Sequence, residues 1–206
     1  GYATFDDYLG ALSHAKRKQV RRERRLVAES GVRVQVLTGA EVTEAHWDAV
    51  FAFYQDTGDR KWGRPYLTRA FFSLLGATMP QAVVLVLATR AGRPLAGALH
   101  LRGSHALYGR YWGALEHVPC LHFEACYYQA IEFAIAHGLA RVEAGAQGPH
   151  KLARGYLPAT TFSLHHLAHP GLRGAVGDFL GHERSAGAQQ AERLAAHGPF
   201  RDEAGF

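Results

Sequence analysis

The chain has 206 residues, a formal net charge of +5, and 48% hydrophobic against 20% charged residues. This composition is typical of a globular protein with a full core, and it excludes a disordered chain. Two cysteines in so long a chain exclude a disulfide framework and indicate a reducing compartment, so we expect a cytoplasmic protein. The apolar runs are too short to predict a membrane span.

The positive charge is concentrated in one segment. Residues 16–25 hold seven Lys or Arg residues and one acid, whereas the rest of the chain holds sixteen basic and seventeen acidic residues. Apolar residues at helical spacing predict one long helix over residues 4–30, with Thr4 as its N-cap. The basic face of this helix is a candidate to bind phosphates, as in tRNA; the alternative is a solvated helix face.

The next part of the chain alternates between strand and helix patterns. We predict a strand over residues 32–37, followed by two helices over 43–57 and 67–80. Three strands then follow with short turns between them, and they form an antiparallel meander. These strands span residues 82–88, 95–101 and 106–114.

A strand–helix–strand unit follows the meander. A helix over residues 122–136 and a strand over 140–147 complete a right-handed parallel crossover from the strand 106–114. A short helix or loop leads to a last strand over 160–167 and to a terminal helix over 170–206. The prediction is an α/β (α+β) fold in one domain, with a mixed sheet and helices on both faces.

This order of elements resembles the Gcn5-related N-acetyltransferase (GNAT) fold. In that fold the fourth and fifth strands splay apart, and the acyl donor binds between them. The resemblance places the donor cleft between residues 106–114 and 140–147. GNAT enzymes usually hold the donor's pyrophosphate with a glycine-containing loop before the crossover helix. The corresponding residues 116–121 contain no glycine.

Three segments are similar to signatures of the FemAB-like predicted N-acyltransferases, a peptidoglycan biosynthesis protein-like group of the GNAT superfamily. They are Leu107-Tyr-Gly-Arg-Tyr-Trp-Gly, Leu121-His-Phe-Glu-Ala-Cys-Tyr-Tyr-Gln and Glu143-Ala-Gly-Ala-Gln-Gly-Pro-His-Lys-Leu-Ala-Arg-Gly-Tyr. The resemblance covers about the whole chain. Family members carry a preceding GNAT-like half, so we expect this chain to be the C-terminal half of a longer protein.

The resemblance also implies a reaction. It predicts an N-acyltransferase or aminoacyltransferase whose donor is an acyl-CoA or an aminoacyl-tRNA. The acceptor is an amine on a small molecule or on a cell-wall precursor. The alternative is a non-catalytic half that serves as a scaffold or ligand-binding partner for the preceding half.

Polar residues at the end of the crossover strand are the catalytic candidates. Glu143, in a mainly apolar strand, is the candidate base for the amine proton; the alternative is an ion pair with Arg110 or Arg141. Gln147 is a candidate to hold a carbonyl group, and His150 a candidate to shuttle protons near neutral pH. For both, the alternative is a loop residue that bonds to the backbone.

The strand 106–114 supplies the candidates for substrate binding. Strict alternation puts Tyr108, Arg110 and Trp112 together on one face, as a ligand wall, and Tyr111 on the other face near the strand end. The alternative is aromatic packing with an arginine that reaches solvent.

Three charged residues complete the predicted substrate site. Lys151 and Arg154, three apart on a short helical turn, are candidates to clamp a phosphate or carboxylate; the alternative is a solvated pair. Glu124 lies at the start of the crossover helix, where we expect it chiefly to cap the helix. The Cys and His clusters lack the spacing of a zinc site, so no metal is predicted.

Overall fold

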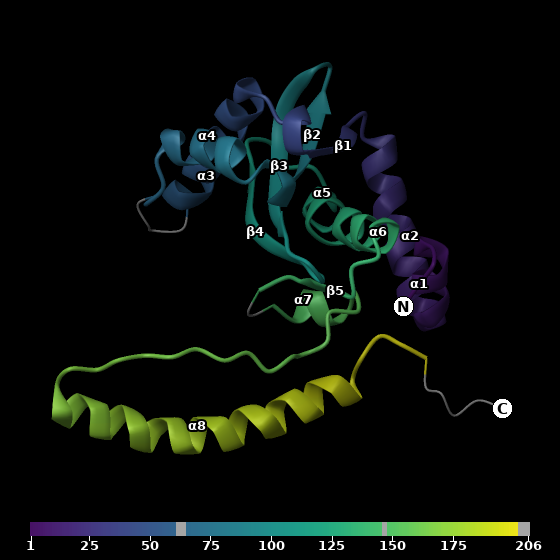
Figure 1. Ribbon diagram of the computed structural model, residues 1–206. Helices are drawn as coiled ribbons and strands as arrows, with labels where there is room; N and C mark the ends of the chain where they lie inside the picture. The colour runs from purple at the N-terminus through teal and green to yellow at the C-terminus, as the bar shows by residue number, and fades with distance from the viewer. Residues whose placement is uncertain (61–64, 146–147, 202–206) are drawn as a thin grey trace. The chain divides into compact units, whose positions relative to one another are not determined.

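The computed structural model describes residues 1–60, 65–145 and 148–201 (Figure 1). The chain divides into two compact units, Gly1–Gln147 and Gly148–Phe206. The first unit holds a sheet and the helices that cover it. The second holds a short helix, α7 (Pro149–Leu152), and a long one, α8 (Pro170–Ala196).

The N-terminal segment forms two helices, α1 (Phe5–Ala11) and α2 (His14–Glu29), where one long helix was predicted. Thr4 caps α1 as predicted, because its side chain accepts a hydrogen bond from the Asp7 amide at 3.1 Å. The backbone is extended at Leu12, and this residue is fully buried. The break between α1 and α2 thus falls at a residue of the core. Gly31, in the left-handed region at φ +74°, follows the end of α2 as predicted.

Five strands form one sheet in the order β1-β2-β3-β4-β5. The neighbours pair antiparallel from β1 to β4, and β4 pairs parallel with β5. This arrangement confirms the predicted GNAT-like mixed sheet, with a meander followed by a parallel crossover. The strands are β1 (Arg33–Thr38), β2 (Val83–Arg90), β3 (Arg93–Arg102), β4 (Ala106–Ala114) and β5 (Arg141–Glu143).

Helices cover both faces of the sheet, as predicted (Figure 1). On one face, α3 (Glu44–Arg60) and α4 (Arg69–Thr78) pack against alternate residues of β2 such as Leu85. On the other face, α2 and the crossover helix pack against the intervening residues of β2 such as Val86. Because both faces are covered, β2 is buried along most of its length, which explains its continuous apolar sequence. Two short 3₁₀ turns, Gly39–Glu41 and Pro80–Ala82, flank these helices.

The predicted crossover helix is confirmed, with one irregular turn. It consists of α5 (Leu121–Phe123), a π-helical turn (Glu124–Tyr128) and α6 (Gln129–Ala136), which follow one another without a break. A π-helical turn inside an α-helix is rare and often marks a functional site.

Two predicted strands differ from the structure. β5 ends at Glu143, and Gly145 takes a positive φ of 72°, so residues 144 and 145 do not continue the predicted strand. The last two residues of that prediction, 146 and 147, lie outside the described residues. The predicted strand over residues 160–167 is wrong: these residues form no regular element. Their alternation is that of a strand, but no strand in the described ranges pairs with them, and a strand needs a partner for its backbone.

The terminal helix α8 begins at Pro170, as predicted, but it ends at Ala196, short of the predicted end at residue 206. Residues 198–201 are not helical, and residues 202–206 lie outside the described residues. The side chain of His169 caps α8 by accepting a hydrogen bond from the Leu172 amide at 3.2 Å. None of its residues is buried. Within the described parts of the chain, no helix is both long and apolar enough to span a membrane.

Candidate functional site

The pairing between β4 and β5 stops early. It consists of three residue pairs, the last of which joins Tyr108 to Glu143, whereas β4 continues to Ala114. From Gly109 onward, β4 therefore has no strand partner on this side among the described residues. The backbone N–H and C=O groups of such an edge can bond to a ligand. This open edge lies where the sequence predicted the two strands to diverge.

A β-bulge lies on β4 at the same point. Leu99 of β3 pairs with Tyr111, and the next residue, His100, pairs with Gly109, so Arg110 is the extra residue on β4. A bulge interrupts the strict alternation of side chains. Tyr111 consequently packs on the α3 face, and Trp112 packs on the opposite face.

The predicted ligand wall of Tyr108, Arg110 and Trp112 on one face is therefore wrong. Tyr108 pairs with Leu101, which packs on the α3 face, so Tyr108 shares its face with Tyr111. The Arg110 guanidinium lies over the Tyr111 ring, 5.3 Å from its centroid. The bulge thus brings Tyr108, Arg110 and Tyr111 together and directs Trp112 toward the crossover helix.

The helix α3 closes the far end of the open edge. The Thr57 hydroxyl donates a hydrogen bond to the Trp112 carbonyl oxygen at 3.1 Å. A Cβ atom added at Gly113 would lie only 2.2 Å from the Phe53 carbonyl oxygen, so α3 and β4 are in backbone contact here. As far as the described residues show, the edge is thereby left without a strand partner from Gly109 to Tyr111, between the end of β5 and α3.

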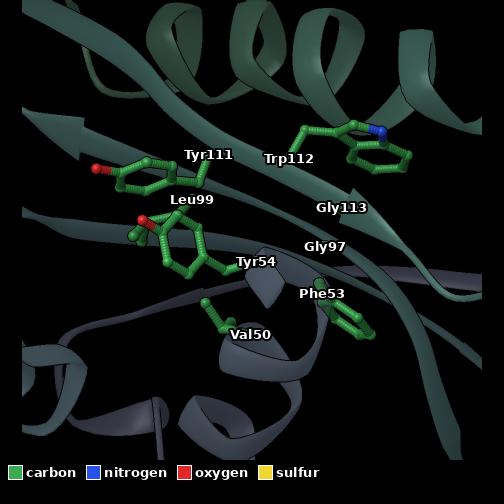
Figure 2. A pocket seen from close by; sticks show the side chains of 8 residues that line it. All are labelled: Val50, Phe53, Tyr54, Gly97, Leu99, Tyr111, Trp112 and Gly113. Atoms are coloured by element: carbon green, nitrogen blue, oxygen red, sulfur yellow. The ribbon is translucent and has the colours of Figure 1, made fainter. Parts of the chain in front are cut away.

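Three tyrosines line the open edge on the α3 face. The hydroxyl groups of Tyr66 and Tyr111 are 2.8 Å apart, and the Tyr54 hydroxyl accepts a hydrogen bond from the Tyr66 amide at 3.1 Å. The rings of Tyr54 and Tyr111 lie edge to face, with their hydroxyls at the same end (Figure 2). Burial, and then the hydrogen bond to Tyr66, raise the pKa of Tyr111 to about 12, so its hydroxyl keeps its proton at neutral pH.

Sequence reasoning did not single out Tyr54 or Tyr66. Tyr54 lies inside the predicted helix over residues 43–57, and Tyr66 lies between that helix and the next predicted one, so neither belongs to a motif. The sequence does not show which hydroxyl groups meet across the fold.

A small cavity lies beneath these tyrosines (Figure 2). Its volume is about 10 Å³, which leaves room for one water molecule at most. The cavity is therefore a packing gap between α3 and β4 and does not hold a substrate. The residues that line it are Val50, Phe53, Tyr54, Gly97, Leu99, Tyr111, Trp112 and Gly113.

Glu143, the predicted base, is the last residue of β5. Its carboxylate forms an ion pair with Arg141 at 3.2 Å and is 37% exposed. As predicted, its side chain faces away from that of Val142, which packs under α6. The ion pair that the sequence offered as the alternative is thus observed, and it leaves part of the carboxylate accessible. Gln147 lies outside the described residues.

Three predicted site residues, His150, Lys151 and Arg154, belong to the second unit. Arg154 is buried, and its guanidinium donates a hydrogen bond to the His150 carbonyl oxygen at 2.7 Å. This bond holds the α7 turn, so a solvated pair of Lys151 and Arg154 is not what the structure shows. Burial, and then the charges of Arg154 and Lys151, lower the pKa of His150, which favours the neutral ring.

Glu124 is buried and contacts α2, so its prediction as a helix cap is wrong. The helix begins at Leu121, which places Glu124 one turn further on. Its two carboxylate oxygens accept hydrogen bonds from Arg24, each at 3.1 Å, and Gln129 donates a third at 2.7 Å. Arg24 also pairs with Glu132 at 2.8 Å. Burial opposes the charge of Arg24, but the bond to Glu132 and the charge of Glu124 raise its pKa.

Three amides at the start of the crossover helix, which follows the glycine-free loop, are bonded to backbone carbonyl oxygens. The N–H groups of Phe123 and Glu124 both donate to the Cys120 carbonyl oxygen at 3.0 Å, and Leu121 donates to Val118 at 3.2 Å. Cys120 adopts the left-handed conformation, with φ 64°, to make this turn. Among the residues that the structure describes, no group of His, Cys, Asp or Glu could hold a metal ion.

The meander, the parallel crossover and the early divergence of its two strands together define a GNAT-like α/β protein. Within this class the chain belongs to the FemAB-like family, described as peptidoglycan biosynthesis/recognition, whose model matches residues 1–202. A search of curated proteins gives no match.

Several solved structures are similar to this chain at low sequence identity. An aminoglycoside acetyltransferase from an uncultured soil metagenomic sample, in complex with sisomicin, is 10% identical, with a TM-score of 0.44 over 68% of this chain and 97% of that chain. An integron cassette protein from the mobile metagenome of V. cholerae is 12% identical, with a TM-score of 0.43 over 71% and 98%. A ribosomal-protein-alanine N-acetyltransferase from Brucella melitensis biovar Abortus 2308 is 14% identical, with a TM-score of 0.41 over 67% and 99%.

Proposed function

We propose that the chain is an N-acyltransferase or aminoacyltransferase that moves an acyl group from a thioester or ester donor to an amine. The observation that carries this proposal is the end of β4–β5 pairing at Tyr108 and Glu143. It leaves the backbone of Gly109–Tyr111 open to an extended donor, which can add to the edge through main-chain hydrogen bonds. The bulge at Arg110 interrupts the ladder with β3, and we expect a backbone N–H group there to stabilise a developing oxyanion.

The residues around the edge suit direct transfer. The amine attacks the acyl carbonyl carbon, the carbonyl oxygen becomes an oxyanion, and the thiolate or alkoxide leaves as the carbonyl re-forms. Glu143, part of whose carboxylate is accessible, accepts the proton that the amine loses. Tyr111 keeps its proton at neutral pH and donates a hydrogen bond to the leaving group. No cysteine takes part in this scheme.

Further observations favour one chemical class of donor and one of acceptor. The amides of Leu121, Phe123 and Glu124 at the start of the crossover helix already donate to backbone carbonyl oxygens, so these three are not free to hold the pyrophosphate of an acyl-CoA. This favours an aminoacyl ester, such as a charged tRNA, over an acyl-CoA. The family description favours an amine of a peptidoglycan precursor as the acceptor.

The test is a transfer assay on the whole chain, with acyl-CoAs and charged tRNA as donors and a panel of amines that includes a peptidoglycan precursor. Glu143→Gln should lower kcat at least about a hundred-fold, the usual contribution of a general base. The matched control is Glu116→Gln, which removes another carboxylate paired with an arginine, Arg90. Full activity of Glu143→Gln would remove Glu143 from the mechanism. Absence of turnover with every donor would contradict transferase activity.

A scaffold role is the second candidate. The cavity beside the open edge has room for no more than a water molecule, which is the observation that favours it. A scaffold half would bind the donor weakly or not at all, and it would show no turnover alone. Transferase activity that appears only on addition of a preceding GNAT-like half would support the scaffold role.

A further inference from the structure

A stripe of four cations runs along the exposed face of α2. Lys18, Arg21, Arg22 and Arg25 are spaced three and four residues apart, so they lie on one side of the helix, and all four are exposed. None of them forms an ion pair with another described residue. The opposite side of α2 is buried through Val20 and Val27. We refer to these four residues as the basic stripe.

The basic stripe is held on a fixed support. Arg24, which belongs to the same run of basic residues, is bonded to Glu124 and Glu132 of the crossover helix. The buried carboxylate of Glu23 accepts a hydrogen bond from Gln19 at 2.9 Å and another from the Tyr128 hydroxyl. These bonds fix the orientation of α2, so the backbone that carries the four cations needs no rearrangement to present them together to a partner.

An open groove lies beside the basic stripe. Its volume is about 410 Å³, and four of its seven lining residues are aliphatic; the other three are two arginines and the buried Glu124. The lining residues are Arg24, Arg25, Val27, Ala28, Val32, Val34 and Glu124. Leu26, next to Arg25 in the chain, is 39% exposed. Cations therefore adjoin two apolar features, the groove and Leu26.

We propose that this face of α2 binds the surface of a membrane that contains anionic phospholipids. The basic stripe contacts headgroup phosphates, while Leu26 and the groove take up part of the acyl region. Mixed cationic and aliphatic surfaces fit this partner. Single-stranded nucleic acid is bound by cations interleaved with aromatic side chains, and neither the stripe nor the groove has an aromatic residue. The proposal does not depend on the transferase activity.

Vesicle co-sedimentation of the whole chain tests the proposal. We expect binding to vesicles of phosphatidylcholine mixed with phosphatidylglycerol at about two to one, weaker binding at high salt, and little binding to phosphatidylcholine alone. Arg21→Gln/Arg22→Gln should weaken binding about thirty-fold, since each basic residue near an anionic surface contributes about five-fold. The matched control is Arg93→Gln/Arg102→Gln, which removes two exposed charges of β3 and should leave binding unchanged.

Leu26→Gln separates a membrane from other polyanions. It should weaken binding to the anionic vesicles several-fold, because the apolar contact is lost, while any binding to uncharged tRNA as a probe stays the same. Three results would overturn the proposal: no sedimentation with the anionic vesicles, equal vesicle binding by the Arg21→Gln/Arg22→Gln variant, or tighter binding to tRNA with no effect of Leu26→Gln on vesicles.

Discussion

His100 shows how a single polar residue is accommodated in the core of this sheet. It is 2% exposed, and its Nε2 atom lies 3.4 Å from the carbonyl oxygen of Cys126, in the π-helical turn. Burial lowers its pKa to about 4 from 6.5, so the folded protein holds a neutral ring at neutral pH. The ring therefore fills the space between β3 and the irregular turn of the crossover helix without carrying a charge.

The first prediction concerns stability against pH. Between about pH 6.5 and pH 4 the unfolded chain binds a proton at His100 that the folded protein does not, so the free energy of unfolding falls as the pH falls. His100 lowers the free energy of unfolding by about 3 kcal/mol over this range. The effect is absent above the pKa that His100 has in the unfolded chain, and it levels off below its pKa in the folded protein. Urea unfolding at pH 7, 6, 5 and 4 should show a smaller decline in His100→Phe than in the wild type.

The slope of stability against pH is the measurement here, so a constant packing cost of His100→Phe does not affect it. The matched control is His14→Phe, since His14 is exposed at the start of α2. That variant should decline as steeply as the wild type. Equal slopes for His100→Phe and the wild type would contradict a buried, neutral His100.

At the scale of elements, the contact between α3 and β4 closes one end of the candidate site. It depends on the absence of a side chain at Gly113, where a Cβ atom would lie 2.2 Å from the Phe53 carbonyl oxygen and 2.6 Å from its carbon. Both neighbours are backbone atoms, so no side chain can move aside. Any larger residue at this position must push α3 away from the sheet.

The second prediction follows from this contact. Gly113→Ala should lower the free energy of unfolding by about 3 kcal/mol, at the upper end of the cost of overpacking, and it should disturb the neighbouring tyrosines. The control is Gly10→Ala, in α1, where an added Cβ atom would meet no atom within 4 Å. Because alanine favours a helix more than glycine does, this variant should raise the free energy of unfolding by about 0.5 kcal/mol. Urea unfolding measures both. A Gly113→Ala variant as stable as the wild type would show that α3 and β4 are not in backbone contact.

The third prediction concerns the attachment of α2. Arg24→Met leaves the buried Glu124 carboxylate without its main partner and should cost about 3 kcal/mol. Arg24→Met/Glu124→Gln removes the unpaired charge as well and should recover part of that loss. The comparison is Arg69→Met, which breaks ion pairs with Glu44 and Asp48 at the surface. This variant should lower the free energy of unfolding much less than Arg24→Met does. A double variant less stable than Arg24→Met would contradict a structural role for this pair.

The sequence predicts well those features that depend on residues close together in the chain. Thr4 caps α1, Gly31 follows α2, and the apolar run of β2 is buried on both faces, because each depends on nearby residues. The bulge at Arg110 has no local signal, since it depends on how β3 and β4 pair. Because of the bulge, Trp112 lies on the opposite face of the sheet from Tyr108 instead of beside it. For this reason the sequence identified only some of the residues at the candidate site.

At the scale of the whole molecule, the two units differ in how they are built. The first, Gly1–Gln147, contains the sheet and every residue of the four hydrophobic clusters that the structure defines in its described ranges. The second, Gly148–Phe206, has α7, a stretch without regular structure and α8, which buries no residue. A segment with few buried contacts opens at low free energy, whereas a core strand opens only with the whole unit.

The fourth prediction is that proteolysis begins in the stretch between α7 and α8. Phe162 and Leu164 are 92% and 100% exposed there, in backbone without helix or strand, so chymotrypsin can bind them without any unfolding. Phe71 is also partly exposed but lies within α4, which must unwind before it is cut. Brief digestion followed by intact mass measurement should therefore yield cuts after Phe162 or Leu164 first. Phe162→Ser/Leu164→Ser should slow this first cut, while Phe71→Ser should not change it. First cuts inside β2, β3 or β4 would instead show that the sheet is less stable than the stretch that follows it.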